Sequence, residues 1–515
     1  MADGGTGISN PKVTLQIIPA QQLSTVTEQK VLIVGQMLTG TATAGQLVQE
    51  IGNAGQEDGL FGSTSMVAGM VRRFKQVNRV TQLDVLPLAD GGSATDATAV
   101  CTVTGTATAA GRVTLTVGSA KDFKVNVDIP SGASETEAAT AIVTAFANNV
   151  SKAPFTQAST AGAVTFTATN GGTHANDWTI AIEGSVAGLT FALTGWTGGA
   201  TDPVLTDIFD AIGDIRYQTI VYPAVYGLAE VEDLLNDRFN STNDVKDGVA
   251  IQVRKGTLAE LKAYTSALNS QSLVIFGNRT LTGTTAIGTA IQEMPDVSAS
   301  EIAALRSLRL TQDAPLGDIL TTVAPLDQFG GTSIASLPYF NTLVPQHLPE
   351  TAGTGWTQEE SDELESSAVS VFGSNRAFNN VILGQVVTTY LTDEAGNTDD
   401  SFKFLNTIDT ASVVREFFFA NLKSRYAQTR LTDGDVLPRR DMANAITIRG
   451  FCNQLYDLLA EQGLVQLGTP AKTDFNDNLA ITINVRTGTA TINMAPLLVG
   501  QLRVVLGTVQ INFGG

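Results

Sequence analysis

Buried strands that alternate with segments of helical periodicity constrain this chain more than any other feature. KVLIVG (residues 30–35) is an uninterrupted apolar run, and the apolar residues of positions 66–77 recur at helical spacing. The pattern resumes after residue 202 with TIVYP (219–223) and SLVIF (272–276), and Thr257-x-x-Glu260 forms a capping box that starts a helix. Strands that alternate with helices of ~10–15 residues predict a largely parallel sheet covered on both faces.

A stretch of different composition interrupts this pattern between about residues 92 and 201. It is rich in Thr, Ala and Gly, and five segments alternate apolar with polar residues: VTLTV, FKVNVDI, VTFTAT, WTIAI and LTFAL. The capping box Ser134-x-x-Glu137 predicts one helix among these strands. Glycine-rich joints flank the stretch, and we therefore predict a β-rich domain inserted in a surface loop of the α/β domain.

Both ends of the chain carry an alternating segment that has no neighbouring strand in the sequence. An isolated strand exposes unpaired backbone donors and acceptors, so we expect each segment to pair with a sheet edge elsewhere. These predicted arm strands lie in PKVTLQIIPA and RVVLGTVQINF, and their apolar faces consist of Val13, Leu15, Ile17, Val505, Val509, Ile511 and Phe513.

Charge and hydropathy narrow the choice of partners. The chain has 31 basic and 50 acidic residues, and its net charge of −19 repels phosphate, which argues against direct binding of nucleic acid. No stretch reaches the ~18 uninterrupted apolar residues of a membrane helix, so we expect no membrane insertion. The first ten residues lack the basic start and apolar centre of a secretory signal. We expect a soluble protein that is made in the cytoplasm.

Few residues offer catalytic or metal-binding chemistry. Cys101 and Cys452 have no metal-ligand spacing, and we expect both to be small buried hydrophobes. Histidine is the usual base near neutral pH, and we interpret His174 and His347 as turn or surface residues. The glycine-rich join after Val34 lacks both a Walker lysine and G-x-G-x-x-G. We predict no metal and no other cofactor.

Ser333 provides the main argument for an enzyme. GTSIASLP (331–338) resembles the motif around the nucleophilic serine of subtilisin-like proteases. Such a serine needs a histidine base oriented by an aspartate, in the order Asp, His, Ser. Only His174 precedes Ser333, and it falls between two predicted strands of the β-rich region. We interpret Ser333 as a loop serine, and a subtilisin-like serine hydrolase stays the alternative. A host-binding or surface-layer protein built on the β-rich region is a further alternative.

A basic cluster in the last third of the chain contrasts with the acidic background. Two interpretations are open: a solvated face, or a patch for an acidic protein partner, because complementary potentials fix orientation. The cluster consists of Arg415, Lys423, Arg425, Arg430, Arg439, Arg440 and Arg449. Predicted helices at 410–428 and 441–462 and a predicted strand at 479–485 surround it.

Three segments of this last third, taken together and in their order, are a more specific signal than any single motif. They are VVTTYLTDEAGNTDDSFKFLNTIDTASVVREFFFANLKSRYAQTRLTDGD (386–435), EQGLVQ (461–466) and LLVGQLRVVLGTVQINF (497–513). In these segments the chain resembles the tail sheath proteins of contractile-tailed bacteriophages, especially the Mu-like group. The resemblance implies a structural subunit and not an enzyme. Such a subunit polymerises helically around the tail tube by strand exchange through its arms, and it contracts to drive the tube through the host envelope for genome ejection.

The same resemblance implies a fold, partners and a location. The fold is α/β, with a subtilisin-like sheath domain, an inserted β-rich domain and an α+β C-terminal domain. The partners are other copies of the chain, the tail tube protein, and the baseplate and tail terminator proteins, in a virion tail assembled in the host cytoplasm. The candidates for tube contact are Lys423, Arg425, Arg430, Arg439 and Arg440. The predicted parts are an N-terminal arm (1–27), the sheath domain (28–91 and 202–355), the outer domain (92–201), the tube-facing domain (356–495) and a C-terminal arm (496–515).

Overall fold

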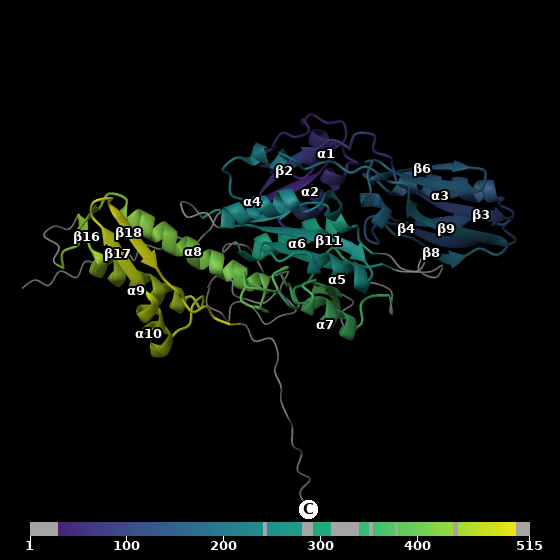
Figure 1. The fold of residues 1–515 in the computed structure, drawn as a ribbon. Coiled ribbons are helices and arrows are strands. Elements are labelled where there is room, and N and C mark those ends of the chain that lie inside the picture. Colours follow the sequence, from purple (N-terminus) through teal and green to yellow (C-terminus); the bar gives the residue numbers. More distant parts are fainter. Residues whose placement is uncertain are drawn as a thin grey trace, which may run out of the picture.

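The computed structural model describes residues 29–239, 245–280, 292–310, 339–349, 354–375, 380–435 and 441–500. Figure 1 shows the described elements as groups in a row, with an α/β group in the middle, a β-rich group at one end and the C-terminal helices at the other. Each group has its own cluster of buried apolar side chains.

A five-stranded parallel sheet forms the centre of the α/β group. Its order is β12-β11-β10-β1-β2, and every neighbouring pair is parallel. The predicted parallel sheet is therefore confirmed. Its strands are β1 (Lys30–Gln36), β2 (Gln82–Leu88), β10 (Thr219–Val221), β11 (Val249–Gly256) and β12 (Leu273–Arg279).

Helices cover both faces of this sheet. On one face α2 (Met66–Val77) and α6 (Pro295–Leu310) pack against each other and on β1 and β11. A Cβ at Gly35 would lie 3.1 Å from Met70 Sδ, so the glycine lets α2 approach β1 closely. Because crossovers between parallel strands are right-handed, α4 (Ala229–Phe239) and α5 (Leu258–Ser266) belong on the other face, and α5 packs on β11 and β12. The predicted capping box of Thr257 and Glu260 starts α5. Shorter elements are α1 (Gln56–Phe61), η2 (Ile208–Ile212) and η3 (Ala224–Tyr226).

Two antiparallel sheets follow β2 in the sequence and form the two-sheet region (residues 92–201). Their orders are β6-β7-β3-β9 and β5-β4-β8, and α3 (Glu135–Asn149) packs beside them. The predicted capping box of Ser134 and Glu137 starts α3, and the five predicted strands are present. The strands are β3 (Thr98–Gly105), β4 (Gly111–Val117), β5 (Lys124–Ile129), β6 (Phe155–Thr160), β7 (Ala163–Ala168), β8 (Ile180–Ser185) and β9 (Leu189–Thr197), and η1 spans His174–Asp177.

The long helix α8 (Leu405–Tyr426) joins the α/β group to the C-terminal elements (Figure 1). Near its start Asp409 pairs with Arg306 of α6 at 2.6 Å, and further along Glu416 pairs with Arg216 at 2.7 Å. Its second half buries Phe417 and Phe418 in the C-terminal core. The other elements are α7 (Gln358–Ser366), β13 (Phe372–Asn375), β14 (Asn380–Leu383), β15 (Arg430–Leu431), β16 (Met442–Ala443), α9 (Ala445–Glu461), α10 (Thr469–Asn478), β17 (Ala480–Asn484) and β18 (Thr489–Asn493).

Candidate assembly surface

The place where an enzyme with this sheet order would bind its ligand is filled by the chain itself. In doubly wound sheets that place lies beyond the carboxyl ends of the strands at the switch point, here between β1 and β10. Gln36, fully buried at the end of β1, donates from Nε2 to Asp90 Oδ1 and to the Gly171 carbonyl oxygen, both at 2.6 Å. The Tyr226 hydroxyl donates to Gln36 Oε1 at 2.7 Å. The polar groups at the switch point therefore serve an internal network.

His347 has the neighbours of a catalytic base but no accessible nucleophile. Its Nε2 lies 2.9 Å from Ser298 Oγ, and its Nδ1 lies 3.1 Å from Glu301 Oε2. This is the connectivity of a serine, histidine and acid triad. Ser298 and Glu301 are both 0% exposed on α6, and Glu301 also pairs with Arg73 at 3.0 Å. A buried serine cannot reach a substrate, so we interpret this group as structural.

The two histidines correct one prediction. His347 does close a turn, since its N–H donates to the Val344 carbonyl oxygen at 3.3 Å, but its interpretation as a surface residue is wrong, because its side chain is 8% exposed and lies in the network just described. His174 does lie in a turn, η1, but it is buried, and burial lowers its pKa to about 4. The imidazole of His174 is therefore neutral near neutral pH.

The other residues that the sequence offered for catalysis or metal binding form no such site among the described residues. Cys101 and Cys452 are free and buried, as expected, and burial raises the pKa of the Cys101 thiol to about 12. Ser333 lies outside the described residues. Within the described ranges, no three His, Cys, Asp or Glu side chains are grouped so that they could hold a metal ion. No helix in that part of the chain is long and apolar enough to cross a membrane.

Two arginines of the predicted basic cluster donate to backbone carbonyl oxygens of neighbouring helices. Arg415 donates to the Phe239 carbonyl oxygen at 2.9 Å, and Arg449 donates to the carbonyl oxygens of Asn476 and Leu479. These two arginines therefore hold α8 against α4 and α9 against α10.

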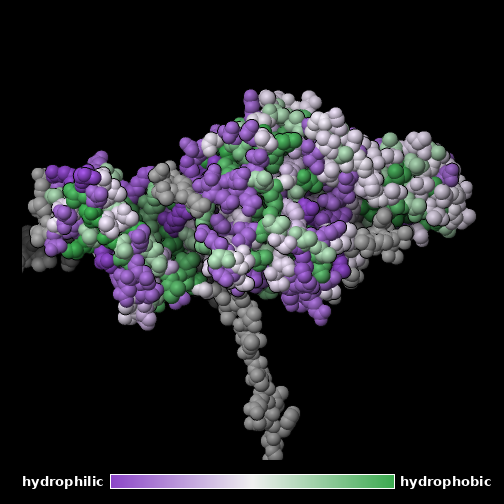
Figure 2. Space-filling view, in the orientation of Figure 1, coloured by the Kyte–Doolittle hydropathy of each residue, from purple (hydrophilic) through white to green (hydrophobic). Residues whose placement is uncertain are grey.

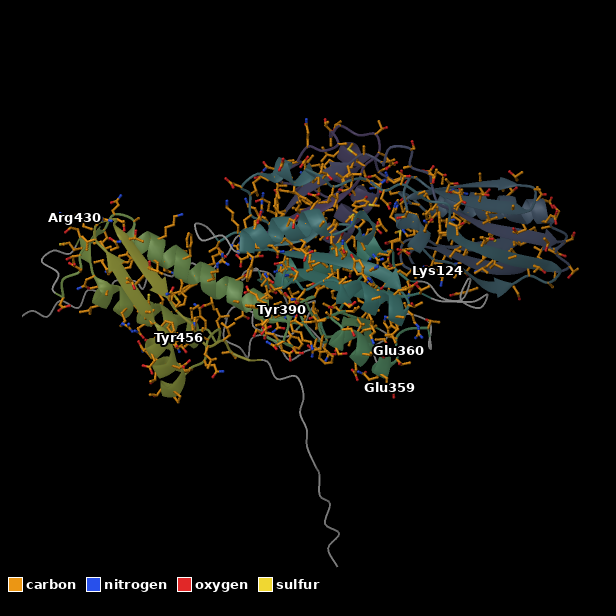
Figure 3. The ribbon with its side chains drawn as sticks, viewed as in Figure 1. Lys124, Glu359, Glu360, Tyr390, Arg430 and Tyr456 are labelled. Atoms are coloured by element: carbon orange, nitrogen blue, oxygen red, sulfur yellow. The ribbon has the colours of Figure 1, made fainter. Side chains whose placement is uncertain are left out.

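Lys423, Arg425 and Arg430, three of the tube-contact candidates, are exposed at the end of α8 and just beyond it. Arg430, labelled in Figure 3, forms an exposed ion pair with Asp441, which reduces its charge for a partner. Arg439 and Arg440 lie outside the described residues.

The β17–β18 hairpin is a two-stranded sheet of the C-terminal elements. β17 and β18 pair with each other in antiparallel register from Ala480↔Asn493 to Asn484↔Thr489, and neither has another strand partner among the described residues. One face, with Ile481, Ile483 and Ile492, rests half-buried on the C-terminal core. Two strands alone are marginal in water, so both free edges can accept a further strand.

Five large apolar side chains of the C-terminal elements are exposed among the described residues. Figure 2 shows apolar residues at the surface of the group of elements that contains the β17–β18 hairpin. The largest exposed fraction is that of Leu467, at 78%. The others of the C-terminal elements are Ile446, Val485, Leu497 and Val499. Exposed apolar side chains on the group of elements that carries the hairpin are typical of a protein–protein contact.

The last described residues already pair with the C-terminal elements. Val465 and Leu498 form an antiparallel bridge, and the Val499 N–H donates to the Leu464 carbonyl oxygen at 3.2 Å. The predicted arm residues Val505, Val509, Ile511 and Phe513 lie outside the described residues, as do Val13, Leu15 and Ile17. Their pairing stays a prediction.

β18, which completes the hairpin, is not predicted from the sequence. Residues 489–493 (TATIN) alternate, but only one large apolar residue, Ile492, marks the pattern. Gly488, with φ +69°, occupies the turn before β18 in the left-handed region that favours glycine. This glycine next to an alternating pentapeptide was the available signal.

Comparison with known proteins supports the resemblance to phage tail sheath proteins. No family model matches the chain. The "Mu-like prophage FluMu tail sheath protein" of Haemophilus influenzae is 25% identical over 452 residues, which are 85% of this chain and 84% of the relative. This similarity confirms the resemblance to phage tail sheath proteins of the Mu-like group and extends it from the last third to most of the chain.

Two solved structures also align with the chain at lower similarity. The sheath tail protein Lin1278 of Listeria innocua is 13% identical with a TM-score of 0.45, and the alignment covers 92% of each chain. The helical sheath of the anti-feeding prophage in its contracted state is 10% identical with a TM-score of 0.45, and the alignment covers 98% of this chain and 99% of the other.

Proposed function

We propose that this chain is the structural subunit of a contractile tail sheath, a helical polymer that surrounds a tail tube. The single observation that carries the proposal is the β17–β18 hairpin, whose outer edges pair with no further strand in the part of the chain that the structure describes. The similarity to a Mu-like tail sheath protein over 85% of the chain supports it. On this proposal the chain acts without catalysis, and its location is the tail of a virion assembled in the host cytoplasm.

Strand addition supplies the contact between copies. Backbone hydrogen bonds give affinity, and the alternation of side chains sets the register of the added strand. About five backbone bonds at about 1 kcal/mol net each would stabilise one arm contact by several kcal/mol. The arms that carry Val13 and Val505 would each add to the β17–β18 sheet of a neighbouring copy. Because such a head-to-tail contact does not close on itself, it produces a helix.

Contraction on this proposal moves copies as rigid bodies while the arms keep them linked. The ion pairs of α8 with Arg306 and Arg216 support this, because they fix the helix to the α/β group within each copy. The energy for contraction is stored at assembly, in contacts that improve when the polymer shortens. The division into sheath, outer and tube-facing domains stays a prediction.

The tube, baseplate and terminator proteins are the proposed partners beyond other copies. Lys423 and Arg425 are the exposed cations that support a contact with an acidic tube surface. The substitutions Arg439→Glu and Arg440→Glu should weaken salt-sensitive binding to the tube protein. Unchanged binding would remove this pair from the contact.

Deletion of residues 1–20 tests the arm contact. We expect the truncated protein to stay a folded monomer by circular dichroism and sedimentation, while the full chain forms hollow helical tubes by negative-stain microscopy. A control keeps the arm and changes only one face: Val13→Asp with Leu15→Asp and Ile17→Asp should prevent assembly, and Thr14→Asp with Gln16→Asp should affect it less. Helical tubes formed by the truncated protein would contradict the proposal.

A further inference from the structure

Helix α6 is enclosed on every side, although it carries charged residues. All of its residues from Pro295 to Arg309 are buried. A helix that is buried all round is normally apolar, because burial of a charge is costly unless the charge finds a partner. The charged residues of α6 are Asp296, Glu301, Arg306 and Arg309. The role of this helix therefore lies in its contacts inside the molecule.

The first turn of α6 completes the core of the two-sheet region. Val297, and Met294 just before the helix, belong to the buried apolar cluster of that region. Ser119 Oγ, also from the two-sheet region, donates to Glu293 Oε2 at 3.1 Å. A change in the packing of the two-sheet region therefore reaches the start of α6.

Near its other end α6 holds the start of α8. Arg306 donates from Nη2 to Asp409 Oδ1 at 2.6 Å and from Nη1 to the Gln218 carbonyl oxygen at 2.5 Å. The side chain of Arg306 is 4% exposed and that of Asp409 is 0% exposed. Two charges that pair away from water depend on each other, because the loss of either partner leaves the other buried and unpaired. The position of α8 therefore depends on the position of Arg306.

Between these two contacts α6 crosses the core of the α/β group. Ile302 and Leu305 belong to that core, and the helix packs on α2 and β11. Met294 and Arg306 are twelve positions apart in the sequence, which is ~18 Å along a helix. Close-packed interiors deform little, so we expect α6 to move as one body when either end is displaced.

α8 continues the connection to the C-terminal elements. Leu405 and Ile408 of α8 belong to the core of the α/β group, whereas Phe417 and Phe418 belong to the C-terminal core. Figure 1 shows α8 running from the α/β group to the C-terminal elements. The cores of the two-sheet region, the α/β group and the C-terminal elements are therefore connected through α6 and α8.

We propose that α6 is a coupling element, through which the packing of the two-sheet region and the position of α8 influence each other. Such coupling acts through a contiguous set of packed side chains and buried ion pairs, and it is reciprocal in free energy. The proposal depends on contacts within one copy of the chain and does not require the sheath function. In a contractile polymer the same helix would carry a displacement of the C-terminal elements to the two-sheet region.

Hydrogen exchange followed by mass spectrometry on the full-length protein tests the coupling from the side of the two-sheet region. Met294→Ala removes a side chain that packs in the two-sheet core at the start of α6. We expect the amides of the two-sheet region and those of residues 405–416 in α8 to exchange about tenfold faster than in the wild type. The control Ile142→Ala removes an apolar side chain of similar size from the same core, on α3, which packs on β3, β5, β6 and β7. It should accelerate exchange in the two-sheet region and leave α8 unchanged.

The opposite direction is tested at α8. Asp409→Asn keeps the shape of the side chain and removes the charge that pairs with Arg306, so exchange should become about tenfold faster at residues 117–123 of the two-sheet region as well as in α8. The control Glu416→Gln weakens the pair with Arg216 further along α8 and should change exchange in α8 alone. The amides of β1 serve as the reference for global unfolding, because the interior of that strand is fully buried.

Circular dichroism first establishes that each variant is folded. Val297→Ala, which removes less volume from the same contact, replaces Met294→Ala if that variant does not fold. Exchange in α8 that stays at the wild-type rate while the two-sheet region exchanges faster would overturn the proposal. An equal acceleration of α8 by Ile142→Ala, or of residues 117–123 by Glu416→Gln, would overturn it too, because the changes would then reflect a general loss of stability.

Discussion

The parallel sheet and the β17–β18 hairpin differ in how far one chain can complete them. In β1, Val31, Leu32, Ile33 and Val34 are all fully buried because helices cover both faces of the sheet. In β17 the side chains alternate between exposed and half-buried positions, and only the core side is covered. The first structure needs nothing from another molecule, whereas the second keeps two edges that a further strand can use.

The ion pairs of the two regions differ in burial in the same way as their strands do. Arg73 is 2% exposed and lies between Glu293 and Glu301, with Asp122 of the two-sheet region at 2.6 Å. In the C-terminal elements the pairs of Arg430 with Asp441 and Lys472 with Asp457 are largely exposed. Exposed pairs contribute little to stability, but removal of one partner from a buried group leaves charges without compensation.

The largest effect should come from Arg73→Ala. This change leaves Glu293 and Glu301 buried without their cation, and we expect a loss of about 3–5 kcal/mol in the free energy of unfolding in urea. The loss should be smaller at pH 5 than at pH 8, because protonation relieves the unpaired carboxylates. Arg430→Ala removes an exposed pair of the C-terminal elements and should cost about 1 kcal/mol or less. Equal losses in the two variants would contradict the distinction between buried and exposed ion pairs.

Asp296→Asn should give the second-largest change in the free energy of unfolding, and this change should depend on pH. Burial raises the pKa of this α6 carboxyl to about 7, so folding favours its protonated form. The cost of ionising it is absent below the unfolded pKa of about 4 and grows as pH rises towards and through 7. Asp296→Asn should therefore match the wild type in urea unfolding at pH 4 and exceed it at pH 8 by about 4 kcal/mol. The same substitution at exposed Asp210 serves as the control, and no gain at pH 8 would refute the account.

The same change from isoleucine to threonine, made in both regions, should give the smallest losses in the free energy of unfolding and compares the two regions directly. Ile33→Thr places a hydroxyl in the closed core and should cost about 2–3 kcal/mol, whereas Ile483→Thr on the half-buried face should cost under about 1 kcal/mol. Thermal unfolding of unassembled protein measures both. If Ile483→Thr were the costlier change, the hairpin would be part of a complete core and the comparison would fail.

Local patterns in the sequence predicted elements but not all of them. The continuous run of β1 and the capping boxes at Ser134 and Thr257 located their elements correctly. β3 and β6 were missed because their alternation depends on small residues such as Ala99 and Cys101 and on single aromatics such as Phe155. Such residues bury little area each, so their periodicity is weak until a second sheet packs on them.

The sequence by itself determined the strongly periodic strands and helices, the strands that are buried on both faces, and the class of protein that the chain resembles. Only the tertiary structure decided where isolated polar residues go. Arg73 and Glu301 are 228 positions apart, and Gln36 and Gly171 are 135 apart, yet each pair is bonded in a buried site. Periodicity reports the burial of one element at a time, whereas the partner of a buried polar group depends on how distant elements pack, because each such group must find a partner wherever the fold supplies one.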